Sequence, residues 1–445
     1  MSNKESSAMT DKGSTAITNK ESSDVKQLPN IFTNLYITSV YTIPRSTKSI
    51  LSEKLNPQVS HNIDYPKFSL GFQHYVHAKK EALDTLSQFD GKKKVYNVIN
   101  KLNKQIDDYD MDIDKISKSF FDLNSKPEII SDNFFGVWET LHMFDLVPTN
   151  GKFKSCHMME NGSTVQAVLL FRDKYTNSDS KSDSYNIYNK LNDERHFEKM
   201  DQKFLNYYTK EKTNRLSIET KQPKKMDLVT LSLGSNWEYR NMKEQDSLLL
   251  FLKQLLASVE ILDNNGNLLC EIFETFTLIT NKILCALAEI FKQVSIVKPL
   301  SINPAIDNKY LVCIGYDQKS TKFNEVLEGL IKTLESNNKK FIVNFSPGYE
   351  FSKEFISVIR KANTDISNRQ FMDVNKILEF IKKENYYGDI YQRYRSEQIK
   401  ASNMWVEKFF FDKKIFNDKS KQIRNETNEI IKTNVVRANL IDSRL

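Results

Sequence analysis

The chain has 445 residues, with 64 Lys and Arg against 57 Asp and Glu and a formal net charge of +7. Apolar residues make up 39% of it, which allows a sizeable core and excludes a globally disordered, collagen-like or disulfide-scaffold protein. Only 12 residues are glycine, although phosphate- and nucleotide-binding loops usually need glycine to bring backbone close to a ligand.

The N-terminus and the cysteines bear on the compartment. Residues 1–27 are polar, repeat the sequence NKESS and contain no apolar run, so we expect a disordered tail and no secretory signal. The apolar stretch Ser247–Leu262 is too short and too polar to cross a bilayer. No C-x-x-C pair occurs, which favours buried, reduced thiols at the four cysteines, Cys156, Cys270, Cys285 and Cys313. We expect a soluble cytoplasmic protein without a membrane partner.

Residues 28–130 are predicted to form an irregular arm and then a helical region. Scattered aromatic and proline residues without a period occupy 28–65, whereas apolar residues recur at helical spacing in Val76–Phe89 and Val95–Ile106. The polar side chains of Ser131–Asn133 then suit the N-cap of a helix that continues to Asp145.

An α/β pattern begins near residue 150. Strands alternate with helices, which implies a parallel or mixed sheet covered by helices. The last two strands lack an intervening helix, which suggests an antiparallel edge strand. The polar stretch 173–225 is interpreted as a long insertion within a domain spanning 131–317. The expected strands are Lys154–Met159, Asp227–Leu233, Leu268–Phe273, Val294–Val297 and Tyr310–Ile314, with helices over Ser247–Leu262 and Thr277–Lys292.

The C-terminal region carries the whole excess of positive charge. Residues 318–445 contain 24 Lys and Arg and 17 Asp and Glu, so the rest of the chain is neutral. Residues 318–413 are predicted to be helical and 414–445 to be a polar tail. Aromatic residues of Tyr387–Phe411 alternate with basic ones, which suits RNA stacking but is also what a helix packed on an α/β core would show, and we favour packing. The helices expected here are Phe323–Leu334, Phe351–Ala362, Val374–Lys383 and Tyr387–Phe411.

The central segment carries the most specific motifs. It contains IFETFT at 272–277, VSIVKP at 294–299 and KYLVC at 309–313, preceded by FFGVWETL at 134–141 and CHMMENGSTVQAV at 156–168. Over roughly 130–316 these motifs resemble the FtsJ-like RNA 2′-O-methyltransferases, particularly the branch with cap-methylating enzymes and homologues in large DNA viruses. The resemblance implies an α/β fold, a Rossmann-like methyltransferase sheet with mainly helical N- and C-terminal extensions, and S-adenosylmethionine as methyl donor.

Family members surround the ribose 2′-hydroxyl with two lysines, an aspartate and a glutamate, one lysine accepting the hydroxyl proton. Laid on this chain, the four positions hold other residues. Gly136 and Glu271 stand at the two lysine positions, Ser232 at the aspartate and Asn308 at the glutamate. The resemblance therefore predicts a pseudoenzyme with no catalytic residues.

The cofactor loop departs from the family in the same way. Where the family has an acid, Pro, Gly, Gly and Phe, this chain has Met159, Asn161, Gly162, Ser163 and Thr164, with Glu160 displaced by one place. This degenerate loop is the candidate cofactor site. We expect no bound cofactor, or S-adenosylmethionine if the protein is active.

Shifting the alignment by a few residues could place a family-type residue at only one tetrad position at a time. Lys309 lies beside Asn308, Asp227 begins the strand that leads to Ser232, and Lys282 follows the IFETFT motif. A one-residue slip at Lys309 would turn its side chain to the opposite face of the sheet. Four independent slips are implausible.

Other catalytic and metal-binding motifs are absent from the sequence. His74 and His77 lack Cys or carboxylate companions at ligand spacing, so no metal is expected. The leading hypothesis is an inactive scaffold that binds RNA or a protein of the capping, transcription or translation machinery. The alternatives are an active cap or RNA ribose 2′-O-methyltransferase and, more weakly, a virion structural protein. If the protein is viral, we expect it in the viral factory or the virion.

Overall fold

The computed structural model divides into two units, Met1–Ile37 and Thr38–Leu445. The predicted tail over 1–27 and the predicted helix Val95–Ile106 lie outside the described residues. The structure describes residues 38–82, 116–158, 161–176, 182–188, 199–209, 215–219, 225–234, 237, 241–317, 321–337, 340–383 and 388–442.

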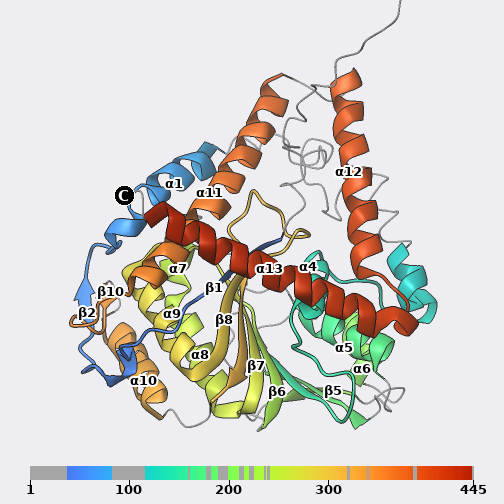
Figure 1. Cartoon of the computed structure of the whole chain (residues 1–445). Coiled ribbons are helices and arrows are strands. Elements are labelled where there is room, and N and C mark those ends of the chain that lie inside the picture. Colours follow the sequence, from blue (N-terminus) through green and yellow to red (C-terminus); the bar gives the residue numbers. More distant parts are fainter. Residues whose placement is uncertain are drawn as a thin grey trace, which may run out of the picture. The chain divides into compact units, whose positions relative to one another are not determined.

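An eight-stranded sheet forms the centre of the second unit (Figure 1). Its order is β1-β8-β9-β7-β6-β3-β4-β5, and the five strands from β7 to β5 are parallel. Strand β9 runs antiparallel between β7 and β8, and β1 pairs antiparallel with β8. The strands are β1 (Ser39–Thr42), β3 (Lys154–Met158), β4 (Ser184–Tyr188), β5 (Leu216–Glu219), β6 (Met226–Leu231), β7 (Leu262–Ile272), β8 (Phe291–Lys298) and β9 (Lys309–Tyr316).

This topology confirms the predicted Rossmann-like α/β fold and corrects two details. The antiparallel strand β9 lies inside the sheet, not at its edge, because β8 and then β1 continue beyond it. Strand β1 comes from the segment predicted to be an irregular arm. A second, two-stranded sheet pairs β2 (Gln58–Ser60) with β10 (Phe341–Asn344).

The helices follow the apolar patterns of the sequence. Helix α9 begins after Thr277, whose hydroxyl accepts a hydrogen bond from the Thr280 amide, as an N-cap residue does. Helix α4 begins at Asn133 after Asp132, but no side chain caps it. The helices are α1 (Phe72–Ala82), α4 (Asn133–Met143), α5 (Ser163–Tyr175), α6 (Gln202–Thr209), α7 (Lys243–Asp246), α8 (Leu248–Ile261), α9 (Leu278–Ile290), α10 (Thr321–Ser336), α11 (Lys353–Lys382), α12 (Gly388–Phe409) and α13 (Phe416–Asp442).

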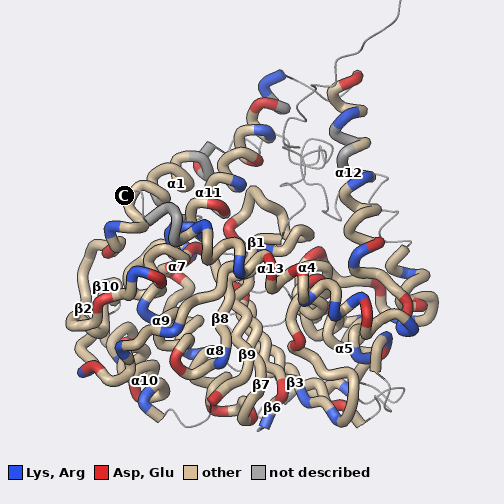
Figure 2. Tube along the Cα trace, viewed as in Figure 1, with Lys and Arg blue, Asp and Glu red and all other residues tan. Residues whose placement is uncertain are grey.

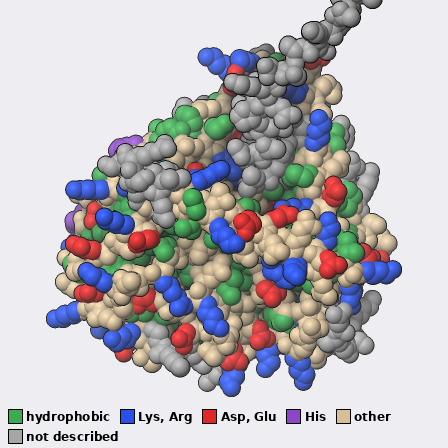
Figure 3. Space-filling view, in the orientation of Figure 1, with side chains coloured by type: hydrophobic (Ala, Val, Ile, Leu, Met, Phe, Trp, Pro, Cys, Tyr) green, Lys and Arg blue, Asp and Glu red, His purple; other side chains and the backbone are tan. Residues whose placement is uncertain are grey.

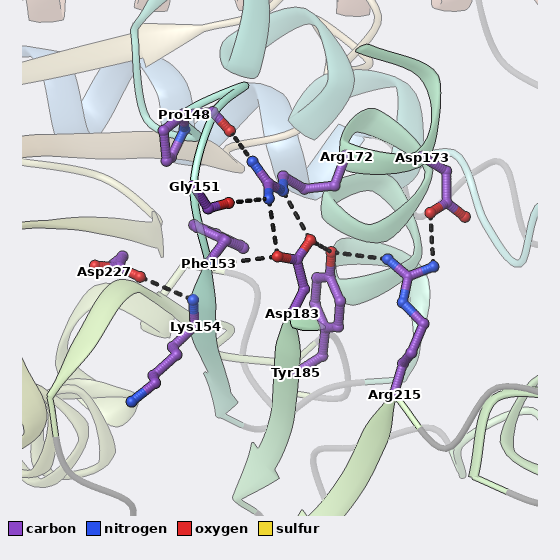
Figure 4. A network of polar contacts seen from close by, with 10 residues as sticks. All are labelled: Pro148, Gly151, Phe153, Lys154, Arg172, Asp173, Asp183, Tyr185, Arg215 and Asp227. Atoms are coloured by element: carbon purple, nitrogen blue, oxygen red, sulfur yellow. Dashed lines mark hydrogen bonds and ion pairs between the residues drawn. The ribbon is translucent and has the colours of Figure 1, made fainter. Parts of the chain in front are cut away.

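The stretch 173–225, predicted to be an insertion, supplies part of the sheet itself. It contributes β4, α6 and β5, and β4 pairs directly with β3. A buried ion pair fixes the start of β4: Arg172 donates two hydrogen bonds of 2.8 Å to Asp183, and both side chains are fully buried. Further bonds from this pair tie in neighbouring backbone at the amino ends of the strands (Figure 4). In the described part of this stretch, the polar residues Asp183 and Asn186 therefore belong to an internal network.

The polar tail expected over 414–445 is also wrong, because α13 is a 27-residue helix packed on the rest of the fold. Its buried residues Phe416, Ser420, Ile423, Thr427 and Ala438 recur at spacings of three, four and eleven, so one stripe faces inward. Figure 1 shows α13 running past β1 and α4, and the Asn434 amide donates to the Val40 carbonyl at 2.8 Å. The predicted helices Phe351–Ala362 and Val374–Lys383 form one continuous helix, α11.

The aromatic stripe of α12 packs inward at its C-terminal end, as favoured. Trp405 and Phe409 are each 1% exposed. The Trp405 indole donates at 3.0 Å to Glu139 on α4, a buried carboxylate that also accepts from Thr38 and from the backbone amides of Leu300 and Ser301. Glu139 therefore joins the N-terminal strand, the domain and the C-terminal helices.

Candidate functional site

The order of the parallel strands reverses between the neighbouring strands β3 and β6, which makes this the topological switch point of the sheet. From β3 the chain proceeds outward through β4 to β5, and it returns to place β6 and β7 on the other side. In open α/β sheets, ligands bind beyond the carboxyl ends of the strands at such a switch point. Gly162 follows β3, Ser232 follows β6, and Glu271 lies at the end of β7.

Three of the four predicted tetrad positions are in direct contact. The Ser232 hydroxyl donates to the Glu271 carboxylate at 2.7 Å, and the Asn308 amide donates to its other oxygen at 2.5 Å. The Leu233 backbone amide adds a third bond at 3.3 Å. The three residues assigned from the resemblance thus lie together, although β6, β7 and the loop before β9 are far apart in the chain.

Glu271 is 6% exposed, and both its carboxylate oxygens accept hydrogen bonds. None of the three donors carries a charge. A buried carboxylate held by neutral donors fixes the ends of β6, β7 and β9 relative to one another, which is a structural arrangement.

Gly136, at the fourth position, faces side chains that fill the space of a larger residue. A Cβ atom there would lie 2.9 Å from Ile302 Cγ1 and 3.3 Å from Tyr310 Cε2. Tyr310 pairs with Glu271 across β9 and β7, so Gly136 adjoins the same network. A lysine at this position would have to displace Ile302.

A cavity of about 10 Å³ remains between these elements. Such a volume holds about one water molecule and is far too small for a ribose. Its lining residues are Asn133, Thr164, Thr230, Leu231, Ser232, Leu269, Glu271 and Tyr310.

The described part of the cofactor loop is tightly packed. Gly162 has φ of +109°, and Ile130 Cδ1 lies 2.6 Å from where its Cβ would be. Gln166 holds the segment before α4 in place by accepting from the Ile130 amide at 3.0 Å and donating to the Glu128 carbonyl at 2.8 Å. At the helix start, the Asn161 side chain accepts from the Ser163 amide at 3.0 Å.

Met159 and Glu160 lie outside the described residues. A glycine leaves room for a ligand only where no other atom takes that room. At Gly162 Ile130 takes it, so the described residues do not fit the close approach that S-adenosylmethionine would need.

The residues that could have rescued an active site lie elsewhere. Lys309 pairs with Ile272, one place after Glu271, so it faces the opposite side of the sheet, where Asp307 and Glu244 lie. Burial lowers the pKa of Lys309 to about 8, against the opposing effect of these two carboxylates.

Lys282 donates to Asn344 at 2.8 Å on the far side of α9. Asp227 accepts from the Lys154 amide at 2.8 Å, at the amino end of β6 (Figure 4). None of the three lysine or aspartate candidates reaches Glu271.

The motif residues retained from the family pattern have structural contacts. Lys298 donates to the carbonyls of Ile306 and Asn308, at 2.8 and 2.6 Å, and so holds the loop before β9. Glu244, which the sequence reasoning missed, accepts from the amides of Phe276 and Thr277 at the start of α9. Only its position about one turn before α8 could have suggested Glu244, because no motif marks it.

Charge on the C-terminal helices is mixed. Along α12, α13 and their surroundings, acidic and basic positions alternate (Figure 2), and on the face shown in Figure 3 the two signs are interspersed. Lys408 pairs with Glu426 at 2.8 Å and Arg424 with Asp145 at 3.2 Å. On the face shown, the basic side chains of these helices are therefore not gathered in one stripe.

Comparison with known proteins identifies the central segment of the chain. A model of FtsJ-like methyltransferases matches residues 134–316. This segment is an FtsJ-like methyltransferase domain. It contains all four tetrad positions, the described cofactor loop and seven of the eight strands of the central sheet.

Relatives of the FtsJ-like domain include cap methyltransferases. The Drosophila melanogaster cap-specific mRNA (nucleoside-2′-O-)-methyltransferase 1 is 28% identical over 150 residues, which cover 32% of this chain and 19% of that protein. An inactive cap-specific methyltransferase 1B of Caenorhabditis briggsae is 25% identical over 167 residues, 36% of this chain and 20% of its own length. The chain thus spans about a fifth of the length of these relatives.

A viral protein and a solved methyltransferase structure match larger parts of the chain. An uncharacterized protein of Acanthamoeba polyphaga mimivirus, R383, is 21% identical over 313 residues, 69% of this chain and 73% of that protein. The solved structure of human methyltransferase-like protein 13 with SAH has a TM-score of 0.26 and 12% identity, covering 46% of this chain and 93% of that one.

Among the residues that the structure describes there is neither a membrane-spanning helix nor a metal-binding cluster. No helix there is both long and apolar enough to cross a membrane. No group of three or more His, Cys, Asp or Glu side chains there could hold a metal ion.

Proposed function

We propose that the FtsJ-like domain is catalytically inactive and that the protein acts as an RNA- or protein-binding scaffold in mRNA capping, transcription or translation. The observation that carries the proposal is the Ser232–Glu271–Asn308 network, which lies at the positions that the resemblance assigns to the family's catalytic groups.

Methyl transfer to a ribose requires a group that takes the proton from a weakly acidic hydroxyl, and a site that holds the ribose beside the methyl donor. At the family's two lysine positions this chain has Gly136 and Glu271. The Glu271 carboxylate is engaged by three donors, and the adjoining cavity holds about one water. Neither the proton acceptor nor the space for a ribose is present among these residues.

The relatives are compatible with either state of the domain. The fly protein is named as a methyltransferase and one nematode protein as an inactive one. An active cap or RNA ribose 2′-O-methyltransferase therefore stays as the alternative, favoured by the names of most relatives. The geometry of the tetrad positions favours the inactive form.

Isothermal titration calorimetry with S-adenosylmethionine tests the proposal on the full chain. We expect no saturable heat at millimolar ligand, because Ile130 fills the approach to Gly162. A stoichiometric binding curve in the micromolar range would contradict the proposal and would favour the active alternative.

RNA binding needs a separate test. Deleting the C-terminal region is unsuitable, because Trp405 and Phe409 are part of the core. We instead compare Lys421→Glu with Arg437→Glu, both exposed on α13, and with Lys48→Glu, an exposed control near β1. If the C-terminal helices bind RNA, each α13 variant should weaken binding and reduce the salt dependence by about one ion, while the control should not. Affinity unaffected by the α13 variants would favour a protein partner.

A further inference from the structure

His142 is a buried imidazole that the proposed function does not use. It lies near the end of α4 and is 1% exposed. Neither of its ring nitrogens has a hydrogen-bond partner among the described residues. Buried polar groups are nearly always paired, so an unpaired ring calls for an explanation.

Aromatic rings from four helices surround this imidazole. Its own helix contributes Trp138, and α5 contributes Phe171 and Tyr175. The remaining rings come from the end of α12, the turn that follows and the start of α13. The distances between ring centroids are 5.3 Å to Trp138, 5.0 Å to Phe171, 5.4 Å to Tyr175, 6.1 Å to Phe409, 4.8 Å to Phe411 and 6.2 Å to Phe416.

This cluster is the place where the C-terminal helices dock on the methyltransferase domain. The Trp138 indole donates to the Phe409 carbonyl at 2.9 Å, and the Tyr175 hydroxyl donates to the Phe411 carbonyl at 3.1 Å. Lys413 donates to the Thr176 carbonyl at 2.6 Å. His142 thus lies at the centre of an interface that aromatic packing and a few backbone-directed bonds hold together.

The charged groups around the cluster offer the ring no counter-ion. Arg424 on α13 pairs with Asp145 and acts on the imidazole as a like charge once it is protonated. Asp412 in the turn acts on Lys174 of α5 and on Tyr175, and the neighbouring Lys413 is held by the Thr176 carbonyl. Burial, together with Arg424, lowers the pKa of His142 to about 3.

A protonated imidazole would have two N–H donors without an acceptor among the described residues. Aromatic faces attract a cation, but that attraction is smaller than the hydration that a buried ion loses. The neutral ring fits the cluster and the charged ring does not.

We propose that His142 makes the docking of α12 and α13 on α4 and α5 acid-sensitive, so that protonation releases the C-terminal helices before the sheet unfolds. The released surface would expose Trp138, Phe171 and Tyr175.

His157 provides the internal comparison. It is also fully buried, but it lies inside the sheet on β3, where Ser155 and Thr230 hydroxyls pair with its two nitrogens at 2.8 Å each. Its protonation would act on the sheet and not on the docking interface, so peptides of β3 report unfolding of the whole domain.

Hydrogen exchange of the full chain between pH 7.5 and 5 tests the proposal. After correction for intrinsic exchange, the opening constant of 409–431 should rise about tenfold per pH unit below pH 6.5, reaching roughly 30-fold at pH 5. Peptides of β3 should remain more protected than 409–431 at every pH in this range, because they exchange only when the whole domain unfolds. His142→Phe and His142→Leu should both abolish the rise in 409–431, and His61→Phe, at an exposed position, should leave it unchanged.

Two results would overturn the proposal. One is a wild-type protein in which 409–431 and β3 lose protection together at every pH. The other is a folded His142 variant in which exchange of 409–431 rises with falling pH as much as it does in the wild type.

Discussion

Restoring the family's lysine at position 271 should destabilise this protein. The Glu271 carboxylate accepts bonds of 2.5 Å from Asn308, 2.7 Å from Ser232 and 3.3 Å from the Leu233 amide. Glu271→Lys removes the acceptor from all three donors and places an unpaired cation where the side chain is 6% exposed.

The size of the effect follows from these contacts. Breaking a buried charged network while leaving a charge unpaired costs about 3–5 kcal/mol. Glu271→Gln keeps the shape and one acceptor oxygen, so it should cost only about 1–2 kcal/mol, the difference between charged and neutral hydrogen bonds. Glu325→Lys on the exposed side of α10 serves as the matched control and should stay within about 0.5 kcal/mol of wild type.

Equilibrium urea unfolding followed by circular dichroism measures these differences. The order of stability should be wild type and Glu325→Lys first, then Glu271→Gln, and Glu271→Lys last. If Glu271→Lys were as stable as wild type, the network would not be a structural element, and the reasoning that the site has been rebuilt would fail.

Three further changes should have measurable effects on unfolding. Arg172→Met should cost about 3–5 kcal/mol, because it leaves the fully buried Asp183 without its cation; a loss below 1 kcal/mol would contradict this. Gly136→Ala should cost about 1 kcal/mol, because overpacking against Ile302 outweighs the gain in helix propensity. Adding Ile302→Val to Gly136→Ala should recover part of the lost stability. If the free-energy losses of the two single variants simply added up in the double variant, the proposed contact between residues 136 and 302 would be wrong. Burial lowers the pKa of His157 to about 3. As the pH falls below about 6.5, His157 is therefore protonated in the unfolded chain before it is protonated in the folded one. The stability that the neutral His157 contributes is complete above pH 6.5 and should fall by about 2 kcal/mol by pH 5. His157→Gln should flatten that part of the pH profile in urea titrations, and an unchanged profile would refute the assignment.

The sequence predicted the central elements well because their patterns are local. Strands β3, β6, β8 and β9 and helices α8 and α9 were expected within three residues of their observed bounds, since each is an apolar run ended by polar or turn residues. Strand β7 ends where expected but begins at Leu262, six residues before the predicted start, because polar residues occupy its first half. Ser232, Glu271 and Asn308, which were assigned from the resemblance, touch in the structure, and no local pattern of the sequence shows that contact.

The wrong predictions concern elements whose buried side chains are polar or whose packing depends on residues far away in the sequence. Strand β4 was missed because Asp183 and Asn186 look like surface residues, yet a buried arginine and neighbouring strands satisfy them. Helix α13 looked like a tail because its inward stripe is interrupted by Ser420 and Thr427. Strand β1 has only four residues, and its place at the sheet edge depends on β8 and on α13, more than 250 residues away.

Methyl transfer to RNA tests the central claim most directly. Full-length protein is incubated with labelled S-adenosylmethionine and capped RNA, beside an active FtsJ-like enzyme as the positive control. The rebuilt network at Glu271 predicts no 2′-O-methylated ribose above the protein-free blank. Turnover that yields 2′-O-methylated RNA and disappears when Glu271 is changed to Gln would contradict the account, because it would show that this site performs the chemistry.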